Sequence, residues 1–141
     1  MNPWGIKTFD DEIACDWLED LYDSDPVAFL AQSLDLSDTG DLDYLPCMGV
    51  LCAAELVHAK HSQNVERIPK ELSQWLEQNT ELGLSGFILP ALNALRQILT
   101  SESELVERWS DNEAAADLWL QHKRELLELL EADFIQRSQV T

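Results

Sequence analysis

The chain has 141 residues, of which 45% are hydrophobic, and it carries 27 acidic against 9 basic side chains, giving a formal net charge of −18. The hydrophobic fraction is large enough to close a core in a chain of this length, which excludes intrinsic disorder. The negative charge excludes nucleic acid and anionic membranes as binding partners and favours basic protein surfaces. We therefore expect a single domain over residues 1–141 whose partners are proteins.

The cysteine spacing and the length of the apolar runs indicate the cellular compartment of the protein. The three cysteines are odd in number, and Cys47 and Cys52, five positions apart, with Cys15 remote from both, show no paired metal-ligand spacing. Thiols of this kind are typical of a reducing compartment. No basic segment precedes an apolar run near the N-terminus, and no run approaches the ~20 residues of a membrane span. We expect a soluble, cytoplasmic protein.

Apolar residues recur with a period near 3.6 along most of the chain, which predicts helices. The first predicted helix covers about Asp11 to Tyr22. The second begins at Asp25-Pro26, a capping residue followed by proline at the first helical position, and reaches about Leu34. The segment Asp35–Asp43 contains Gly40 and is predicted to be a loop.

Five further helices are predicted in the remainder of the chain. Residues 44–62 are rich in small side chains, and Pro69 opens a short helix. Residues 85–100 are apolar on nearly all sides, so we expect this helix to be central. A capping box at 101–104 starts the next helix, and the last covers about residues 113–138. The prediction is an all-α, single-domain bundle of about seven helices.

The first predicted helix has an acidic face opposite its apolar one. Five carboxylates fall within about 100° of arc, and residues 11–23 contain no lysine or arginine. Like charges spaced i,i+4 cost a few tenths of a kcal/mol per pair, a cost that a basic partner would relieve. We predict that the partner-binding residues are the carboxylates of this face, together with three from the following loop if it packs nearby: Glu12, Asp16, Glu19, Asp20, Asp23, Asp38, Asp41 and Asp43.

Two tryptophan-containing motifs carry a resemblance to a known family. The N-terminus reads Trp4-Gly5-x-x-x-Phe9-Asp10-Asp11, and a later segment reads Ser103-Glu104-Leu105-x-Glu107-x-Trp109. In this order the motifs resemble the bacterial domain-of-unknown-function 4259 family over nearly the whole chain. The resemblance implies a small bacterial cytosolic protein and no established activity.

Metal-site patterns are incomplete in this sequence. Glu55, His58 and His61 follow one edge of a helix, but bundle di-metal sites need a second Glu-x-x-His, which the chain lacks. The loop 35–43 resembles the first nine positions of a calcium-binding EF-hand, but Pro46 replaces the bidentate glutamate at the twelfth. We therefore expect no cofactor, although whether Glu55, His58 and His61 bind a metal stays open.

Catalytic motifs are equally sparse. The chain contains no Gly-x-Ser-x-Gly elbow and no glycine-rich phosphate loop, so we expect no enzyme activity. The sequence favours a non-catalytic acidic binding protein, most concretely an immunity protein or inhibitor that covers the basic cleft of a bacterial toxin such as a nuclease. The alternative is a structural or regulatory domain that binds through an apolar groove, its charge serving solubility only. The partner's identity and the oligomeric state stay open.

Overall fold

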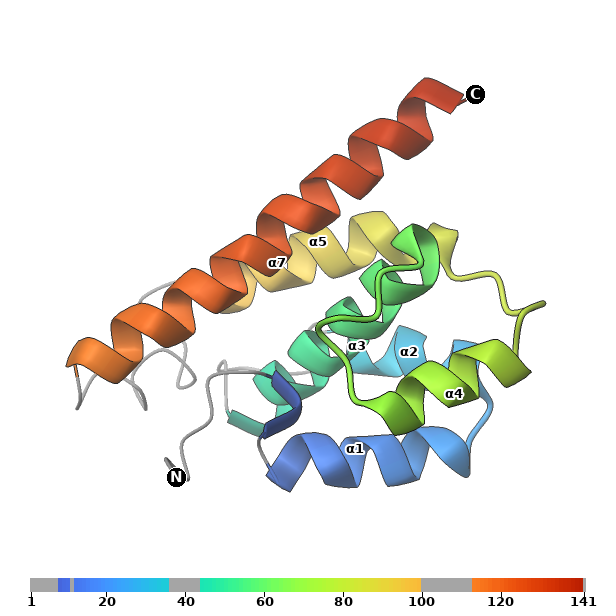
Figure 1. Cartoon of the computed structure of the whole chain (residues 1–141), viewed down its shortest axis with the longest axis horizontal. Coiled ribbons are helices and arrows are strands. Elements are labelled where there is room, and N and C mark those ends of the chain that lie inside the picture. The colour runs from blue at the N-terminus through green and yellow to red at the C-terminus, as the bar shows by residue number, and fades with distance from the viewer. Residues whose placement is uncertain (1–7, 11, 36–43, 100–112, 141) are drawn as a thin grey trace.

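The computed structural model describes residues 8–10, 12–35, 44–99 and 113–140 (Figure 1). The described residues form helices and contain no strand, so the all-α prediction is confirmed. The elements in chain order are the 3₁₀ turn η1 (Thr8–Asp10), α1 (Glu12–Tyr22), α2 (Pro26–Ser33), α3 (Tyr44–Ser62), α4 (Lys70–Gln78), the 3₁₀ turn η2 (Ser85–Phe87), α5 (Ile88–Ile98) and α7 (Glu113–Val140). The helix expected to begin at the capping box lies outside the described residues.

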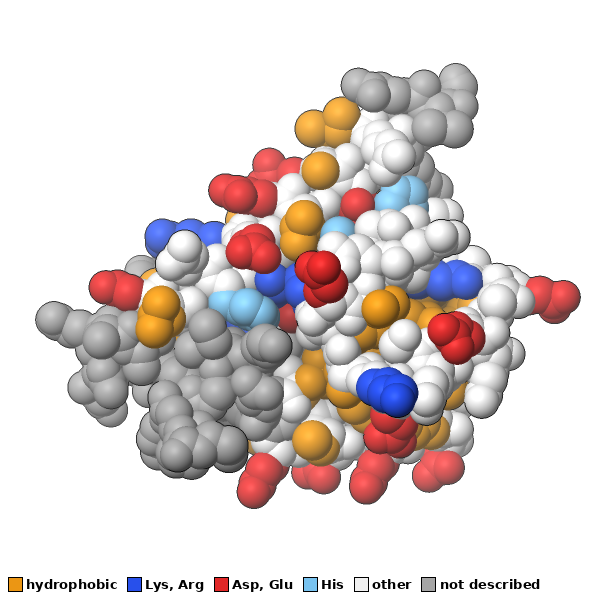
Figure 2. Space-filling model, in the orientation of Figure 1, with side chains coloured by type: hydrophobic (Ala, Val, Ile, Leu, Met, Phe, Trp, Pro, Cys, Tyr) orange, Lys and Arg blue, Asp and Glu red, His pale blue; other side chains and the backbone are white. Residues whose placement is uncertain are grey.

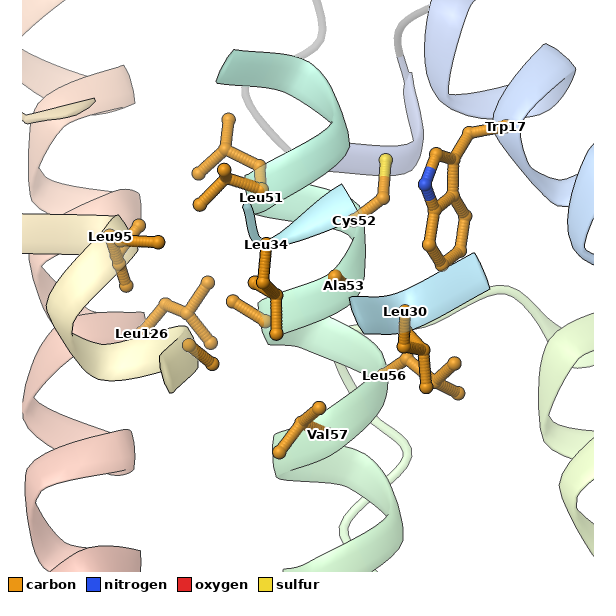
Figure 3. Packing of buried hydrophobic residues seen from close by; sticks show 14 of the residues in the cluster. Trp17, Leu30, Leu34, Leu51, Cys52, Ala53, Leu56, Val57, Leu95 and Leu126 are labelled. Carbon is orange, nitrogen blue, oxygen red and sulfur yellow. The ribbon is translucent and has the colours of Figure 1, made fainter. Parts of the chain in front are cut away.

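Helix α3 is the centre of the described fold. Every residue from Val50 to Ala59 is buried, and α3 packs against α1, α2, α5 and α7. Small side chains such as Ala53 and Ala54 let neighbouring helices approach from several directions. Figure 3 shows Ala53 and Cys52 of α3 among leucines from the surrounding helices.

The prediction that residues 85–100 form the central helix is wrong. Asn93, Arg96 and Gln97 give α5 an exposed arc, and Leu89 on the same side is 41% exposed. The run is also not one continuous helix, because η2 precedes α5 and the α-helix begins at Ile88. Helix α5 covers one side of α3. The small residues of α3 allow α3 itself to occupy the interior.

Helix α2 is attached to α1 through Trp17, which is buried in the core cluster. The indole Nε1 of Trp17 donates a hydrogen bond of 3.1 Å to the hydroxyl of Ser33. Its ring lies 5.1 Å from that of Phe29, centroid to centroid. Figure 3 shows Trp17 beside Leu30 of α2 and Cys52 of α3, so one side chain joins three helices.

The longest described helix is α7, which packs on α5 and α3. Its C-terminal turns project beyond the ends of the other helices in Figure 1. Within the described ranges, no helix has both the length and the apolar character that crossing a bilayer requires.

Gln63, directly after α3, has a φ of 61°, and its N–H donates to the carbonyl of Ala59. This is the left-handed position at a helix C-terminus, where glycine lacks the steric cost of a side chain. We predict that Gln63→Gly raises the free energy of unfolding by up to about 1 kcal/mol, measured by urea denaturation. Gln63→Ala keeps a Cβ and should give no such gain; equal gains from both variants would contradict the backbone explanation.

Candidate functional site

Four predicted carboxylates of α1 and that of Asp23, directly after the helix, form one exposed surface, which we call the acidic stripe: Glu12, Asp16, Glu19, Asp20 and Asp23. All five are exposed, whereas Ala14, Trp17, Leu18 and Leu21 on the other side of the helix are buried. From first to last, the stripe spans about 16 Å at 1.5 Å per residue. Figure 2 shows acidic side chains along the lower edge of the molecule, where α1 lies in Figure 1.

No base of the described residues forms an ion pair with the acidic stripe. In the described part of the chain, the ion pairs involve Glu55, Glu125, Glu131 and Asp133, and none involves a member of the stripe. Among the described residues, no ion pair therefore offsets the negative charge of the stripe. The other predicted partner-binding residues, Asp38, Asp41 and Asp43, lie outside the described residues.

Tyr22 lies at the C-terminal end of α1, next to the acidic stripe. Its ring centroid is 6.1 Å from that of Trp75 on α4. Among the described groups, the buried hydroxyl has no hydrogen-bond partner. Burial raises the pKa of Tyr22 above its ordinary value of 10.0, and the nearby carboxylate of Glu71 raises it further.

A second constellation, the Glu55 cluster, is buried between α3, α7, η1 and the segment after α3. Its members are Thr8, Glu55, Arg67 and Lys123. The Glu55 side chain is fully buried, and Arg67 binds it with two hydrogen bonds, Nε to Oε1 at 2.7 Å and Nη2 to Oε2 at 3.2 Å. Two parallel bonds of this kind are the strongest arrangement available to a guanidinium and a carboxylate.

Thr8 connects this ion pair to α7. Its hydroxyl donates to Oε2 of Glu55 at 2.7 Å and accepts from Nζ of Lys123 at 2.8 Å. Lys123 is fully buried, and its ammonium also lies 5.5 Å from the ring centroid of Trp119. One hydroxyl group thus joins an anion of α3 to a cation of α7.

His122 joins the two cations of the cluster. Its Nδ1 lies 3.2 Å from Nη2 of Arg67 and 3.0 Å from Nζ of Lys123. Both neighbours can only donate, so Nδ1 is the acceptor in this geometry. Arg67 also reaches the backbone carbonyl of His122 at 2.9 Å and the exposed carboxylate of Glu125 at 3.2 Å. Arg67 therefore fastens the segment after α3 to α7.

One helical turn beyond Glu55, His58 makes a separate buried contact. Its Nδ1 lies 2.6 Å from Oδ2 of Asp133 on α7, and both side chains are less than 10% exposed. The other ring nitrogen, Nε2, is buried and has no hydrogen-bond partner within the described structure. The pair fixes the position of α7 along α3, since a shift by one turn would separate the two groups.

The edge formed by Glu55, His58 and His61 does not converge on one point. Glu55 is bound by Arg67 and Thr8, while His58 is bound by Asp133. Across the ranges that the structure describes, no group of three or more His, Cys, Asp or Glu side chains is arranged to hold a metal ion. Cys47 and Cys52 are buried core residues of α3 and Cys15 is exposed beside the acidic stripe.

Helical periodicity in the sequence did not predict which residues satisfy the buried polar groups of α3. Arg67 follows α3 in an irregular segment, and Lys123 and Asp133 interrupt the buried face of α7. One signal was available: Trp119, Lys123, Leu126, Leu130 and Asp133 share a helix face, so two charged residues lie in an otherwise apolar stripe.

The described fold and surfaces define an acidic, all-α protein with an exposed carboxylate face and a separate set of buried ion pairs. The chain belongs to the family described as Domain of unknown function (DUF4259), whose model matches residues 2–122. The resemblance carried by the two tryptophan-containing motifs is therefore correct at the family level. No match was found to a curated protein or to a solved structure.

The Glu55 cluster predicts an asymmetric response to mutation. Arg67→Met leaves the buried carboxylate of Glu55 without its main counter-charge, which should cost about 3–5 kcal/mol of unfolding free energy in urea denaturation. Adding Glu55→Leu to that variant removes the buried anion, so the double variant should be more stable than Arg67→Met alone. A double variant as unstable as the single one would show that Arg67 acts mainly through packing.

Tyr22 predicts a change at alkaline pH. Its pKa is raised in the folded state, so the unfolded chain loses the phenolic proton first and stability falls as the pH rises above 10. Tyr22→Phe removes this contribution and should lose less stability between about pH 9 and pH 11, measured as the urea midpoint. An identical loss of stability in the wild type and in Tyr22→Phe would contradict the assignment.

Proposed function

We propose that this protein is a non-catalytic acidic binding protein that docks the acidic stripe onto a basic protein surface. The most concrete form of the proposal is an immunity protein or inhibitor in the bacterial cytosol that covers the basic cleft of a toxin such as a nuclease. The observation that carries the proposal is that all five carboxylates of the stripe are exposed and make no ion pair with a described base.

The contrast with the interior supports this reading. Of the chain's nine Lys and Arg residues, Arg67 and Lys123 are placed in the interior beside Glu55 and Thr8. Arg96 pairs with Glu131 across α5 and α7. Arg67 and Arg96 therefore pair with carboxylates elsewhere, and no ion pair with a described base offsets the repulsion within the stripe. A partner that supplies the missing cations would relieve that repulsion on binding.

The scaffold beneath the stripe favours rapid docking. Trp17, Leu18 and Leu21 hold the inner face of α1 in the core, so the carboxylates project from a helix that is already formed. A preformed surface loses little conformational entropy on binding. Clefts that hold nucleic acid are lined with Lys and Arg, and an opposing row of carboxylates accelerates association in a salt-dependent manner.

The test uses the purified protein as bait in lysate of its source organism at low salt. The stripe variant changes Asp16, Glu19, Asp20 and Asp23 to Asn or Gln. We predict that the wild type captures a basic protein and that the stripe variant binds it at least about tenfold more weakly, because attraction across the interface is lost. If the partner is a nuclease, the wild type should inhibit its activity and the stripe variant should not.

A matched control removes the same charge from other surfaces. Asp117, Glu77, Glu81 and Glu128 are exposed and lie outside the stripe, so their neutralisation should leave capture and inhibition close to the wild type. Equal weakening in both variants would mean that only net charge matters. A partner held equally by all three proteins, or no partner at all, would overturn the proposal.

A further inference from the structure

Helix α4 is packed less closely than the other described helices. The backbones of α1, α2, α5 and α7 each approach that of α3 closely, whereas α4 forms no comparably close pair with another described element. Figure 1 shows α4 at the outside of the bundle, beside α1, with an irregular segment at each end. Helix α4 therefore reaches its neighbours through side chains rather than through close backbone packing.

The contacts that hold α4 in place are apolar. Leu72 and Leu76 are its buried side chains, and both belong to the core cluster. Trp75 is half-buried, and its ring lies 6.1 Å from that of Tyr22 on α1, centroid to centroid. Three side chains thus attach this helix to the rest of the described structure.

Polar contacts add nothing to this attachment. Within the described part of the chain, no hydrogen bond or ion pair joins Lys70–Gln78 to another helix. The neighbouring polar contact lies after the helix, where the exposed ammonium of Lys60 donates to the carbonyl of Thr80 at 3.0 Å. The buried hydroxyl of Tyr22 has no partner among the described groups. Such a group has lost its water without gaining a bond, so access of water to it is favourable.

The chain is anchored on both sides of α4. Before the helix, Ile68 is buried and Arg67 is held in the Glu55 cluster. After it, Leu84 is buried. Gly83 is exposed, and a Cβ at this position would meet no atom within 4 Å, so the backbone there has space to move. Movement of α4 is therefore confined to residues 69–83, between two fixed points.

The length of α4 determines how it would move. The helix has nine residues, and Pro69 at its N-terminus makes no side-chain capping bond. A helix this short is marginal in water once its buried face is lost. Detachment and unfolding of α4 therefore occur together, as one cooperative unit.

We propose that α4 is a lid over the C-terminal end of α1, which opens as one unit within residues 69–83 while α1, α3, α5 and α7 stay folded. Opening exposes Tyr22, which directly precedes Asp23 of the acidic stripe. Tyrosine is enriched among the residues that dominate binding at protein interfaces, so the lid gives the surface beside the stripe two states. The opening itself is independent of the proposed function, whereas any role in docking rests on it.

The test is native-state amide hydrogen exchange of the full chain in urea concentrations below the unfolding transition. We expect the hydrogen-bonded amides of α4 to exchange through one shared opening, at least about a hundredfold more populated than the opening that exposes residues 50–59 of α3. The α4 opening exposes less surface, so its urea dependence should be weaker. Equal protection and urea dependence in both helices, or α4 amides that exchange one by one without a common value, would overturn the proposal.

A matched pair of mild core substitutions sharpens the test. Ile98 is fully buried on α5, so Ile98→Val should accelerate exchange of the α3 amides about two- to tenfold. It should leave α4 exchange unchanged, because the contacts of Ile98 persist when only the lid opens. Leu76→Val, in the lid, should accelerate exchange in both helices, since Leu76 is unpacked in either opening. Equal acceleration of α3 and α4 by Ile98→Val would overturn the proposal, because α4 would then open only when the whole protein unfolds.

Discussion

The fold depends on placing α3 in the interior although that helix carries Glu55 and His58. A buried carboxylate or imidazole costs several kcal/mol unless its polar atoms are satisfied. The segment after α3 supplies Arg67, and α7 supplies Lys123 and Asp133. These polar contacts determine where α7 crosses α3. Thr8 holds η1 against both helices, because its hydroxyl bonds Glu55 of α3 and Lys123 of α7. Apolar packing alone would tolerate other alignments of α7, whereas these polar contacts favour one.

The same constraint separates the two kinds of charge in this protein. The interior carboxylate of Glu55 is paired with Arg67 at short distance and lies at a contact between elements, whereas the carboxylates of the acidic stripe are exposed and lack described counter-ions. Paired interior charges contribute little to the field outside, because each anion is close to a cation. The external field of the described structure therefore arises largely from exposed acids, and α1 carries a dense row of them on a helix that its apolar face holds in place.

Local signals predicted most of the described helices. Periodicity and Asp25-Pro26 predicted α1 and α2 closely, and α3 has the predicted bounds, Tyr44–Ser62. The error concerned which helix is central, because the apolar count of residues 85–100 hid the polar arc of Asn93, Arg96 and Gln97. The exposure of the acidic stripe followed from spacing on one helix. The Glu55 cluster did not, because its members are separated by up to 115 positions and sequence periodicity carries no information on such pairings.

The late position of α7 in the chain has a consequence for synthesis on the ribosome. Helices α1 to α5 precede it, so the side of α3 that carries Glu55 and His58 stays uncovered until Lys123 and Asp133 have been made. Chains grow at about 5–20 residues per second, so this interval lasts seconds. During it, the polar groups of α3 remain hydrated and interrupt what would otherwise be a continuous apolar surface. Exposed apolar surface on incomplete chains promotes aggregation, and these polar side chains reduce the apolar area that α3 exposes before α7 is made.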